Sequence, residues 1–374
     1  MNTELKAAAG FRKTDDTFTP GAKTLPQRYF VSPQVFAEEE VKIFGRQWVC
    51  VGHQSEVAKT GDYFAREVAR QSLILVRDQA QAIRAFHNVC RHRGTRICEK
   101  GSGHAAALQC PYHAWTYALD GSLRRAPQME TVDGFERADY PLRAVALELW
   151  EGFIFVSLAP APAPFAETFA PLAGKFSDWN LSQLRSGQRI EYDVRANWKL
   201  IFENYSECYH CPLVHPALAK VSPYDSAEND LSEGPFLGGF MKIAKGRSLT
   251  MSGNACALPL GTGGDEARVF YYSIFPNLLL SMHPDYVIVH RIWPQSPERT
   301  VIVCDWFFHP AAFKRADFRP EDAVEFWDMT NRQDWHVCEL SQKGISSRAY
   351  TPGPYSPRES IPAAWDREYL RHVD

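Results

Sequence analysis

The sequence predicts an α+β protein in which a small all-β domain precedes a larger domain with helices packed on an antiparallel sheet. Short β-type runs broken by turn residues occupy residues 48–158. Apolar runs at 268–275, 278–283, 286–293 and 300–308 are separated by turn-forming residues, which indicates an antiparallel meander. A helical pattern over 320–343 follows them, so the second half combines a sheet with helices on one side.

The first half divides into an arm, a helix and the all-β domain. We expect residues 1–25, which are polar and lack periodicity, to form a flexible arm. Ser32 and Pro33 resemble an N-cap and the first position of a helix over 29–48. The β runs of the all-β domain are expected at 48–51, 63–68, 72–76, 83–89 and 150–156.

An Ala/Pro-rich linker over 159–165 separates the two halves, and a helix is expected at about 165–185. The expected domains are therefore an arm and helix (1–44), an all-β domain (45–160) and an α+β domain (165–374).

Composition excludes several classes of protein. The chain has 374 residues and a net charge of −3, which argues against a general nucleic-acid binder. No run of apolar residues reaches the roughly 18 that a membrane-spanning helix needs. The first residues lack the apolar core of a secretory signal, so a cytoplasmic location is expected. Because nine cysteines is an odd number, we expect reduced thiols, with Cys208 and Cys211 as packing residues.

The first candidate metal site combines two short Cys/His motifs. Cys90-Arg91-His92 lies in one loop, and Cys110 with His113 lies in a second loop 17 residues later. Two thiolates and two imidazoles are ligands for tetrahedral zinc, and equally for a [2Fe–2S] cluster with two Cys on one iron and two His on the other. One thiolate and one imidazole from each of two similar loops favours the two-iron cluster. Zinc, and a chance placement of core residues, stay as alternatives.

The second candidate site follows the linker. If the stretch before Pro212 is helical, Glu203, Glu207 and His210 share one face. His215 lies about 140° further round an ideal helix, but Pro212 should break the helix and let His215 turn back. Two His beside such a break, with a remote carboxylate, are typical of mononuclear Fe(II) oxygenases. Two core histidines or a zinc site are the alternatives.

The carboxylate ligand is expected from the helix over 320–343. Asp334 shares a stripe with Trp327 and Cys338, which places it on the inward face. Asp328 has Arg332 at i+4 and is expected to form a surface pair. Asp334 is therefore the first candidate and Asp328 the second.

Both motifs resemble those of one family. Cys-x-His-Arg-Gly with Cys-Pro-Tyr-His-x-Trp resembles the Rieske [2Fe–2S] motif, and Glu-Asn-Tyr-x-Glu-Cys-Tyr-His-Cys-Pro resembles the alpha subunit of Rieske non-haem iron oxygenases. The resemblance extends over about residues 25–374. It implies a Rieske domain followed by an α+β helix-grip catalytic domain. The ligands that it implies are Cys90 and Cys110 on one cluster iron, His92 and His113 on the other, and His210, His215 and Asp334 on the mononuclear Fe(II).

The resemblance also implies partners. The family uses O2 and electrons from NAD(P)H, delivered through a reductase, with or without a ferredoxin. It implies a head-to-tail homotrimer without a beta subunit, in which Glu207 bridges His113 of a neighbouring copy and His210 of its own. Many relatives have Asp at the position of Glu207. Asn204 matches a family Asn near the iron.

The motifs do not specify the substrate. The cavity walls are expected in residues 234–251 and 268–308, with the candidates Phe236, Phe240, Phe270, Tyr272, Phe275 and Met282. Hydroxylation of an aromatic compound, as in aromatic hydrocarbon catabolism, is our first expectation. The alternative is hydroxylation or N-demethylation of an amine such as betaine, choline, carnitine or stachydrine, held by cation–π contacts. A non-catalytic Rieske electron carrier is a remote alternative, because it would not need the second half.

Overall fold

The computed structural model describes residues 10–260 and 267–374. The chain separates into two compact units: one spans Glu40–Ala170, and the other combines the segment ending at Glu39 with Pro171–Asp374. The division expected from the sequence, at 44/45 and at 160/165, remains a prediction.

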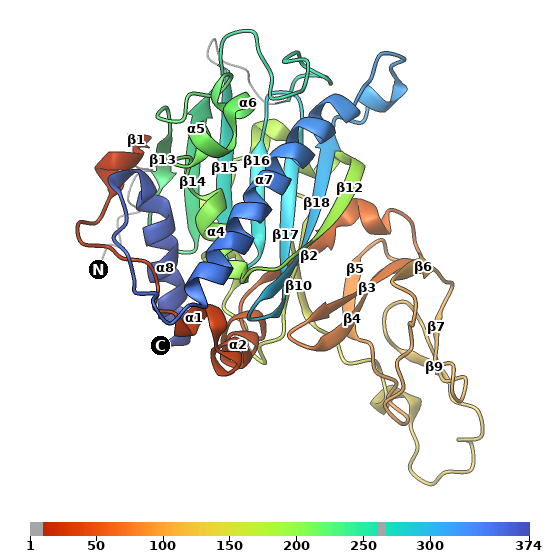
Figure 1. Ribbon diagram of the computed structural model, residues 1–374. Coiled ribbons are helices and arrows are strands. Elements are labelled where there is room, and N and C mark those ends of the chain that lie inside the picture. Colours follow the sequence, from red (N-terminus) through yellow and green to blue (C-terminus); the bar gives the residue numbers. More distant parts are fainter. Residues whose placement is uncertain (1–9, 261–266) are drawn as a thin grey trace, which may run out of the picture. The chain divides into compact units, whose positions relative to one another are not determined.

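The unit that contains the C-terminus is built on an antiparallel sheet of eight strands (Figure 1). The sheet contains the expected meander, whose four runs pair in sequence order. Its strands, in spatial order, are β1 (Arg12–Lys13), β13 (Glu228–Leu231), β14 (Phe236–Lys242), β15 (Arg268–Ile274), β16 (Leu278–Met282), β17 (Val287–Ser296), β18 (Arg299–Phe308) and β12 (Arg185–Val194).

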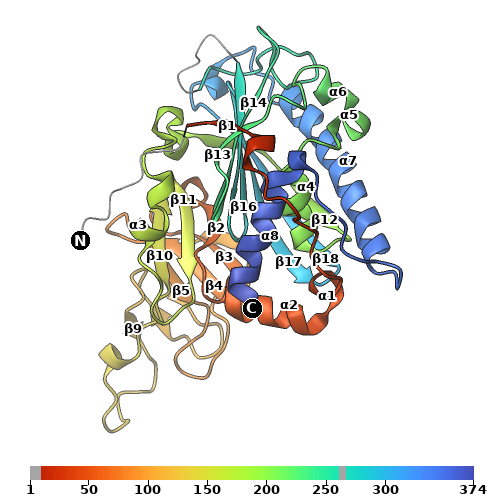
Figure 2. The same ribbon diagram turned by 90° about the vertical axis from the view of Figure 1, so that its left-hand side faces the viewer.

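Helices cover one face of this sheet, which confirms the predicted α+β class (Figures 1 and 2). The helix expected over 320–343 is α7 (Glu321–Ile345). α4 (Trp198–Tyr205) contacts both α7 and the C-terminal helix α8 (Ser360–Val373). Trp198 and Phe202 of α4 pack on Trp365 of α8, so aromatic side chains join the helical layer.

The Glu40–Ala170 unit is a set of small antiparallel sheets, as predicted for an all-β domain. The strands, grouped by sheet, are β10 (Ala146–Trp150), β11 (Phe153–Ser157) and β2 (Val49–His53); β5 (Ile83–His87), β4 (Gln71–Arg77), β3 (Asp62–Val68) and β6 (Ser102–His104); and β7 (Leu108–Gln109), β8 (Thr116–Tyr117) and β9 (Leu123–Arg125). The run expected at 150–156 is instead a hairpin of β10 and β11, because Glu151 and Gly152 turn the chain with φ of 50° and 84°.

Two expected helices are broken into shorter pieces. The helix predicted over 29–48 is divided into α1 (Arg28–Val31), α2 (Pro33–Glu39) and a π-helical turn (Glu40–Phe44). In place of the helix expected at 165–185, α3 (Phe165–Thr168) precedes short 3-10 turns. Gly174 and Asn180 have left-handed φ values of 69° and 46° there, which a continuous helix does not allow.

The predicted flexible arm is partly wrong. Residues 1–9 lie outside the described residues, but Arg12 and Lys13 form β1 and pair with Asn229 and Glu228 at the edge of the sheet. The Thr14 backbone N–H also donates to the Ala227 carbonyl. Because these are long-range backbone contacts, the arm is part of the second unit's fold.

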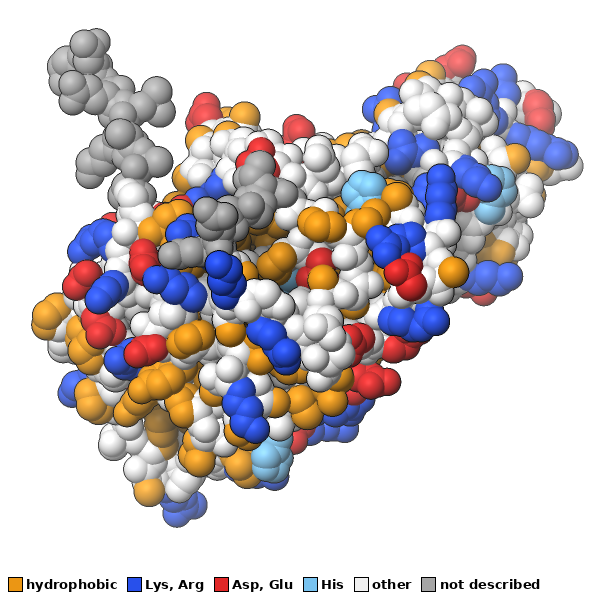
Figure 3. Space-filling model, turned by 90° about the horizontal axis from the view of Figure 1, so that it is seen from above, with side chains coloured by type: hydrophobic (Ala, Val, Ile, Leu, Met, Phe, Trp, Pro, Cys, Tyr) orange, Lys and Arg blue, Asp and Glu red, His pale blue; other side chains and the backbone are white. Residues whose placement is uncertain are grey.

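Charged side chains of both signs are mixed with hydrophobic ones over the face shown in Figure 3. Among the residues described, no helix is both long and apolar enough to cross a membrane.

Candidate active site

The two Cys/His motifs of the Glu40–Ala170 unit fold into loops of the same design. In the first loop, the Cys90 carbonyl accepts from the Gly94 N–H at 3.0 Å, and the Cys90 N–H donates to the Thr95 carbonyl at 2.9 Å. In the second, the Cys110 carbonyl accepts from the Ala114 N–H at 3.2 Å, and the Cys110 N–H donates to the Trp115 carbonyl at 2.8 Å. Gly94 and Ala114 share a left-handed backbone, with φ of 76° and 54°.

The structure brings the four predicted ligands together. Cys90 and Cys110 lie in one buried cluster, each 2% exposed. The centroids of the His92 and His113 rings are 4.7 Å apart, and His92 also stacks on Trp115 at 4.9 Å. The buried Nδ1 of His92 has no hydrogen-bond partner within the described chain. An orphaned imidazole nitrogen beside two buried thiols is a donor set that fits a Rieske cluster.

Tyr117 is a functional candidate that the sequence analysis misses. Its hydroxyl lies 3.4 Å from the Cys90 Sγ and accepts from the Arg91 N–H at 3.0 Å. Burial raises the pKa of the Cys90 thiol, and the Tyr117 hydrogen bond acts against that shift. Its position two residues after Trp115, directly after the loop predicted to hold a cluster, is the signal that could have identified it.

The second candidate site lies where α4 ends. His210, His215 and Asp334 each offer a ligand atom, and these atoms all lie within 4.8 Å of one another. The Asp334 Oδ1 lies 3.3 Å from the His210 Nε2 and 2.8 Å from the His215 Nε2. Two imidazoles and a carboxylate converge from distant parts of the chain, as a 2-His-1-carboxylate site requires.

The other nitrogen of each imidazole is held by a different side chain. Glu207 Oε1 accepts from the His210 Nδ1 at 2.5 Å, and Gln333 Oε1 accepts from the His215 Nδ1 at 2.7 Å. A proton kept on Nδ1 leaves Nε2 of each ring, the atom that lies beside Asp334, as the nitrogen that can bind a metal ion. This outer set of hydrogen bonds fixes the tautomer that a metal ligand needs. Gln333, next to Asp334 in sequence, is the member that the sequence analysis misses.

The charge balance of the triad also suits a cation. Burial raises the pKa of Asp334, but the hydrogen bonds from His210 and His215 outweigh it and bring the pKa below its usual value. Burial lowers the pKa of His210, but the bonds to Asp334 and Glu207 more than offset it and raise this pKa to about 10. The carboxylate is therefore ionised, and positive charge is favoured between these groups.

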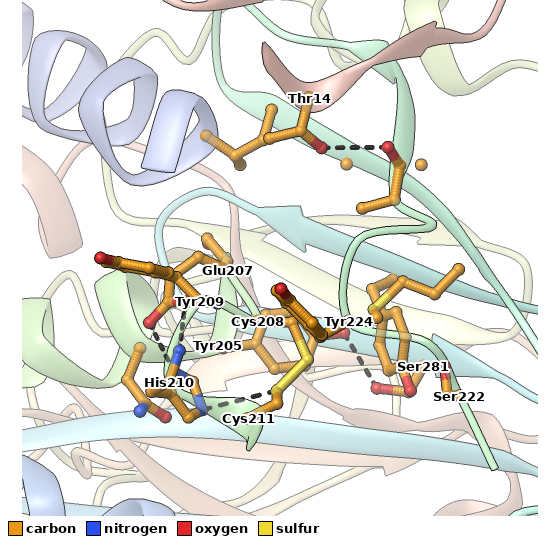
Figure 4. A pocket seen from close by; sticks show the side chains of 18 of the residues that line it. Thr14, Tyr205, Glu207, Cys208, Tyr209, His210, Cys211, Ser222, Tyr224 and Ser281 are labelled. Carbon is orange, nitrogen blue, oxygen red and sulfur yellow. Dashed lines mark hydrogen bonds and ion pairs between the residues drawn. A yellow bond between two sulfur atoms is a disulfide. The ribbon is translucent and has the colours of Figure 1, made fainter. Parts of the chain in front are cut away.

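The turn before His210 differs from the sequence prediction. α4 ends at Tyr205, and α5 (Cys211–Val214) starts after His210, so Glu207 and His210 do not share a helical face with Glu203. The Glu207 carboxylate accepts from the backbone N–H groups of Tyr209 and His210, so these two donors of the turn have a hydrogen-bond partner. Figure 4 shows Glu207 directed at one side of the His210 ring and Cys211 at the other.

Cys208 and Cys211 form a disulfide, which corrects the prediction that they are packing residues. Their spacing of three residues across a turn brings the two Cα atoms to 4.9 Å. The disulfide encloses His210 in a small loop, and the Cys211 Sγ lies 3.9 Å from the His210 Nε2.

The second acidic candidate is placed away from the triad. The Asp328 carboxylate accepts from the Tyr192 hydroxyl at 2.8 Å and from the Arg332 Nε at 2.9 Å. Asn204, the remaining predicted site residue, lies on the wall of the adjoining cavity.

A cavity of about 280 Å³ adjoins the triad, which forms part of its wall. Of the six wall residues predicted, the cavity is lined by Phe240, whereas Phe236, Phe270, Tyr272, Phe275 and Met282 lie elsewhere. Tyr271 and Ser273 line the cavity, because alternate residues of a strand point to opposite faces of the sheet. The aromatic side chains on the wall are Tyr205, Tyr209, Tyr224, Phe240, Tyr271, Trp327 and Trp335.

Comparisons with known proteins identify the two domains. Residues 47–136 match the family model of the Rieske [2Fe–2S] domain, and residues 181–374 match that of the ring hydroxylating alpha subunit (catalytic domain). The oxygenase subunit of glycine betaine monooxygenase from Chromohalobacter salexigens is 33% identical over 377 residues, covering 90% of this chain and 82% of the relative. The oxygenase subunit of carnitine monooxygenase from Acinetobacter baumannii is 37% identical over 341 residues, covering 88% and 87%.

The fold agrees with the same group of proteins. A solved quaternary ammonium Rieske monooxygenase has a TM-score of 0.83 and 25% identity to this chain, covering 98% of it and 100% of the solved chain. The resemblance found in the motifs is thus confirmed over the whole chain. The chain belongs to the Rieske non-haem iron oxygenases as an alpha subunit, a terminal oxygenase with a [2Fe–2S] cluster and a mononuclear iron that receives its electrons from a reductase.

Proposed function

We propose that the chain oxidises a small quaternary ammonium compound, rather than the aromatic compound that was our first expectation. The observation that carries this proposal is the aromatic wall of the cavity beside the triad. Faces of Tyr and Trp rings attract a cation that cannot donate hydrogen bonds, and such rings are the usual means of holding a quaternary nitrogen. The names of the two curated relatives, which act on glycine betaine and carnitine, support the same class.

The geometry supports the proposed ligands. Cys90, His92, Cys110 and His113 would hold the cluster, and His210, His215 and Asp334 would hold the mononuclear iron. When bound, the iron activates O2 with electrons that reach it one at a time through the cluster.

The chain's own residues perform the other tasks. Glu207 and Gln333 keep a proton on the Nδ1 atoms of the two ligand imidazoles, and the aromatic wall holds the cation and displaces water. Hydroxylation of a carbon attached to the quaternary nitrogen gives a carbinol. Its C–N bond then breaks, which releases an amine and an aldehyde.

The assembly and location are further parts of the proposal. The cytoplasm and a homotrimer are proposed, with Glu207 placed between His210 of its own chain and His113 of the partner subunit. The hydrogen bond from His210 to Glu207 supports this role, and so does the exposure of the turn that holds Glu207, in which Tyr209 is 57% exposed. Asn204, on the cavity wall, would position substrate or water near the iron.

A substrate screen tests the activity. The reconstituted protein, with a surrogate reductase and NADH, is supplied with glycine betaine, carnitine, choline or aromatic acids. We expect substrate-dependent O2 uptake and an aldehyde product with the quaternary amines. A cis-diol or phenol from an aromatic acid, without reaction of the amines, would overturn the proposal.

Metal analysis tests the ligands. The wild type should hold about three irons per chain, two in the cluster and one in the 2-His-1-carboxylate site. Asp334→Ala should remove the mononuclear iron and leave the visible spectrum of the cluster unchanged. Asp328→Asn is the matched control on the same helix and should keep all the iron. Retention of mononuclear iron by Asp334→Ala would contradict the assignment.

A further inference from the structure

Arg358 is a cationic side chain on the cavity wall without an ion-pair partner in the described chain. Among the described residues, the Lys and Arg side chains of this wall are Lys13 and Arg358. Lys13 is exposed on the edge strand β1, whereas Arg358 is half-buried. No carboxylate within the described chain forms an ion pair with Arg358, although other arginines of this unit, such as Arg291, pair with Asp.

The backbone holds Arg358 in place. It belongs to the 3-10 turn Pro357–Glu359, which begins with a capping box: the Ser356 Oγ accepts from the Arg358 N–H at 3.3 Å, and the Glu359 carboxylate accepts from the Ser356 N–H at 2.7 Å. The guanidinium lies over the Tyr224 ring, 5.4 Å from its centroid. A side chain fixed at both ends is preorganised, so little entropy is lost when it binds a ligand.

The acidic groups of the cavity wall do not serve as its partners. Glu207 and Asp334 are already bonded to the two proposed ligand imidazoles, and the other two wall carboxylates, Asp15 and Asp225, form no ion pair with Arg358. The aromatic wall suits the ammonium end of a small ligand, and a free guanidinium on the same wall suits a carboxylate, which it can bind through two parallel N–H donors. Glycine betaine and carnitine both carry a carboxylate and a quaternary nitrogen, whereas choline carries an alcohol.

We propose that Arg358 binds the carboxylate of the substrate and so makes the enzyme selective for zwitterionic quaternary ammonium compounds over purely cationic ones. This inference rests on the proposed function, because it requires a quaternary ammonium substrate. A hydrogen bond between charged groups contributes enough binding energy for about a 10- to 100-fold change in affinity.

Binding measurements on the anaerobic holoenzyme separate this role from a structural one. Isothermal titration gives the Kd for glycine betaine, L-carnitine and choline. Arg358→Gln should raise the Kd for the two carboxylates about 30-fold and the Kd for choline less than about twofold. Arg358→Lys, which keeps the charge but loses the paired donors, should restore part of the affinity. Arg348→Gln removes an exposed arginine outside the cavity wall and should change nothing.

Four results would overturn the inference. Equal weakening of betaine and choline by Arg358→Gln would show that Arg358 only supports the cavity. A selective loss with Lys13→Gln instead would assign the carboxylate to Lys13. Wild-type protein that binds none of the three compounds would refute the proposed function, and the inference with it. In contrast, wild-type binding that Arg358→Gln leaves unchanged would refute the inference alone.

Discussion

Two buried carboxyl groups near α4 give the protein a testable pH dependence of stability. Glu203 Oε1 and Asp366 Oδ1 are both buried without a donor from another described residue, and the two carboxyl groups are close enough to interact. The Tyr355 hydroxyl donates to the other Asp366 oxygen at 2.8 Å. Since two carboxylates cannot hydrogen-bond to each other, this contact requires a shared proton. Burial, above all, raises the pKa of Asp366 to about 7.

The sign and size follow from linkage. The pKa of Asp366 is about 7 in the folded state and about 4 in the unfolded chain, so the folded state binds more protons between these values. The contribution of Asp366 to the free energy of unfolding is complete below about pH 4 and is lost as the pH rises through about 7. Between pH 6 and pH 8.5, the linkage relation gives a loss on the order of 1 kcal/mol in the free energy of unfolding.

Asp366→Asn should remove this loss, because an amide donates its N–H to Glu203 at every pH. Urea unfolding of the iron-loaded protein at pH 6, 7, 7.75 and 8.5 measures the free energy of unfolding of the wild type and of the variant. The difference between the two values at each pH removes the contribution of titrating groups that both proteins share. Asp133→Asn, which removes an exposed carboxylate, is the matched control. An unchanged pH slope in Asp366→Asn would refute the shared proton.

Three further predictions concern the cluster, the proposed bridging acid Glu207 and the sheet. Tyr117→Phe should lower the reduction potential of the cluster by about 60 mV, one tenfold step, because the Cys90 sulfur loses a hydrogen bond; an unshifted redox titration would contradict this. Glu207→Gln should keep both metals but slow turnover more than about tenfold. If rapid mixing with O2 and substrate shows that the reduced cluster of this variant is oxidised at a near-normal rate, the proposed bridge is contradicted. Gly239→Ala should cost more than about 2 kcal/mol, because its Cβ would overlap the Glu228 carbonyl, and an unchanged Tm would exclude that packing.

Short-range spacing makes the metal motifs readable from the sequence. Cys90 and His92 lie two residues apart in one loop, and Cys110 and His113 lie three apart in the other, so each pair converges without help from distant contacts. Asp334 is predictable for another reason. Helical periodicity places it on the inward stripe of a long helix, and α7 follows that pattern over nearly its predicted length.

Features that depend on contacts between distant parts of the chain cannot be predicted from local sequence patterns. The strand that contains Phe270 and Tyr272 is predicted nearly to its ends, but alternation alone does not say which of its two faces meets the cavity, and the side that contains Tyr271 does so. Arg358 and Lys13 reach the wall from segments with no motif, at opposite ends of the chain. Their placement depends on tertiary contacts, such as the pairing of β1 with β13, that no local pattern encodes.

The ending of α4 at Tyr205 decides whether a metal triad forms at all. On one continuous helix, His210 and His215 would point about 140° apart, yet their ring centroids are 5.2 Å apart. The chain leaves the helical conformation twice, after Tyr205 and at His215, whose φ and ψ are −123° and 63°. Between these points, Glu207 accepts the free backbone N–H groups and the Cys208–Cys211 disulfide closes the loop. The same carboxylate that completes the turn therefore also orients the His210 imidazole, so the local fold and the geometry of a proposed iron ligand depend on one side chain.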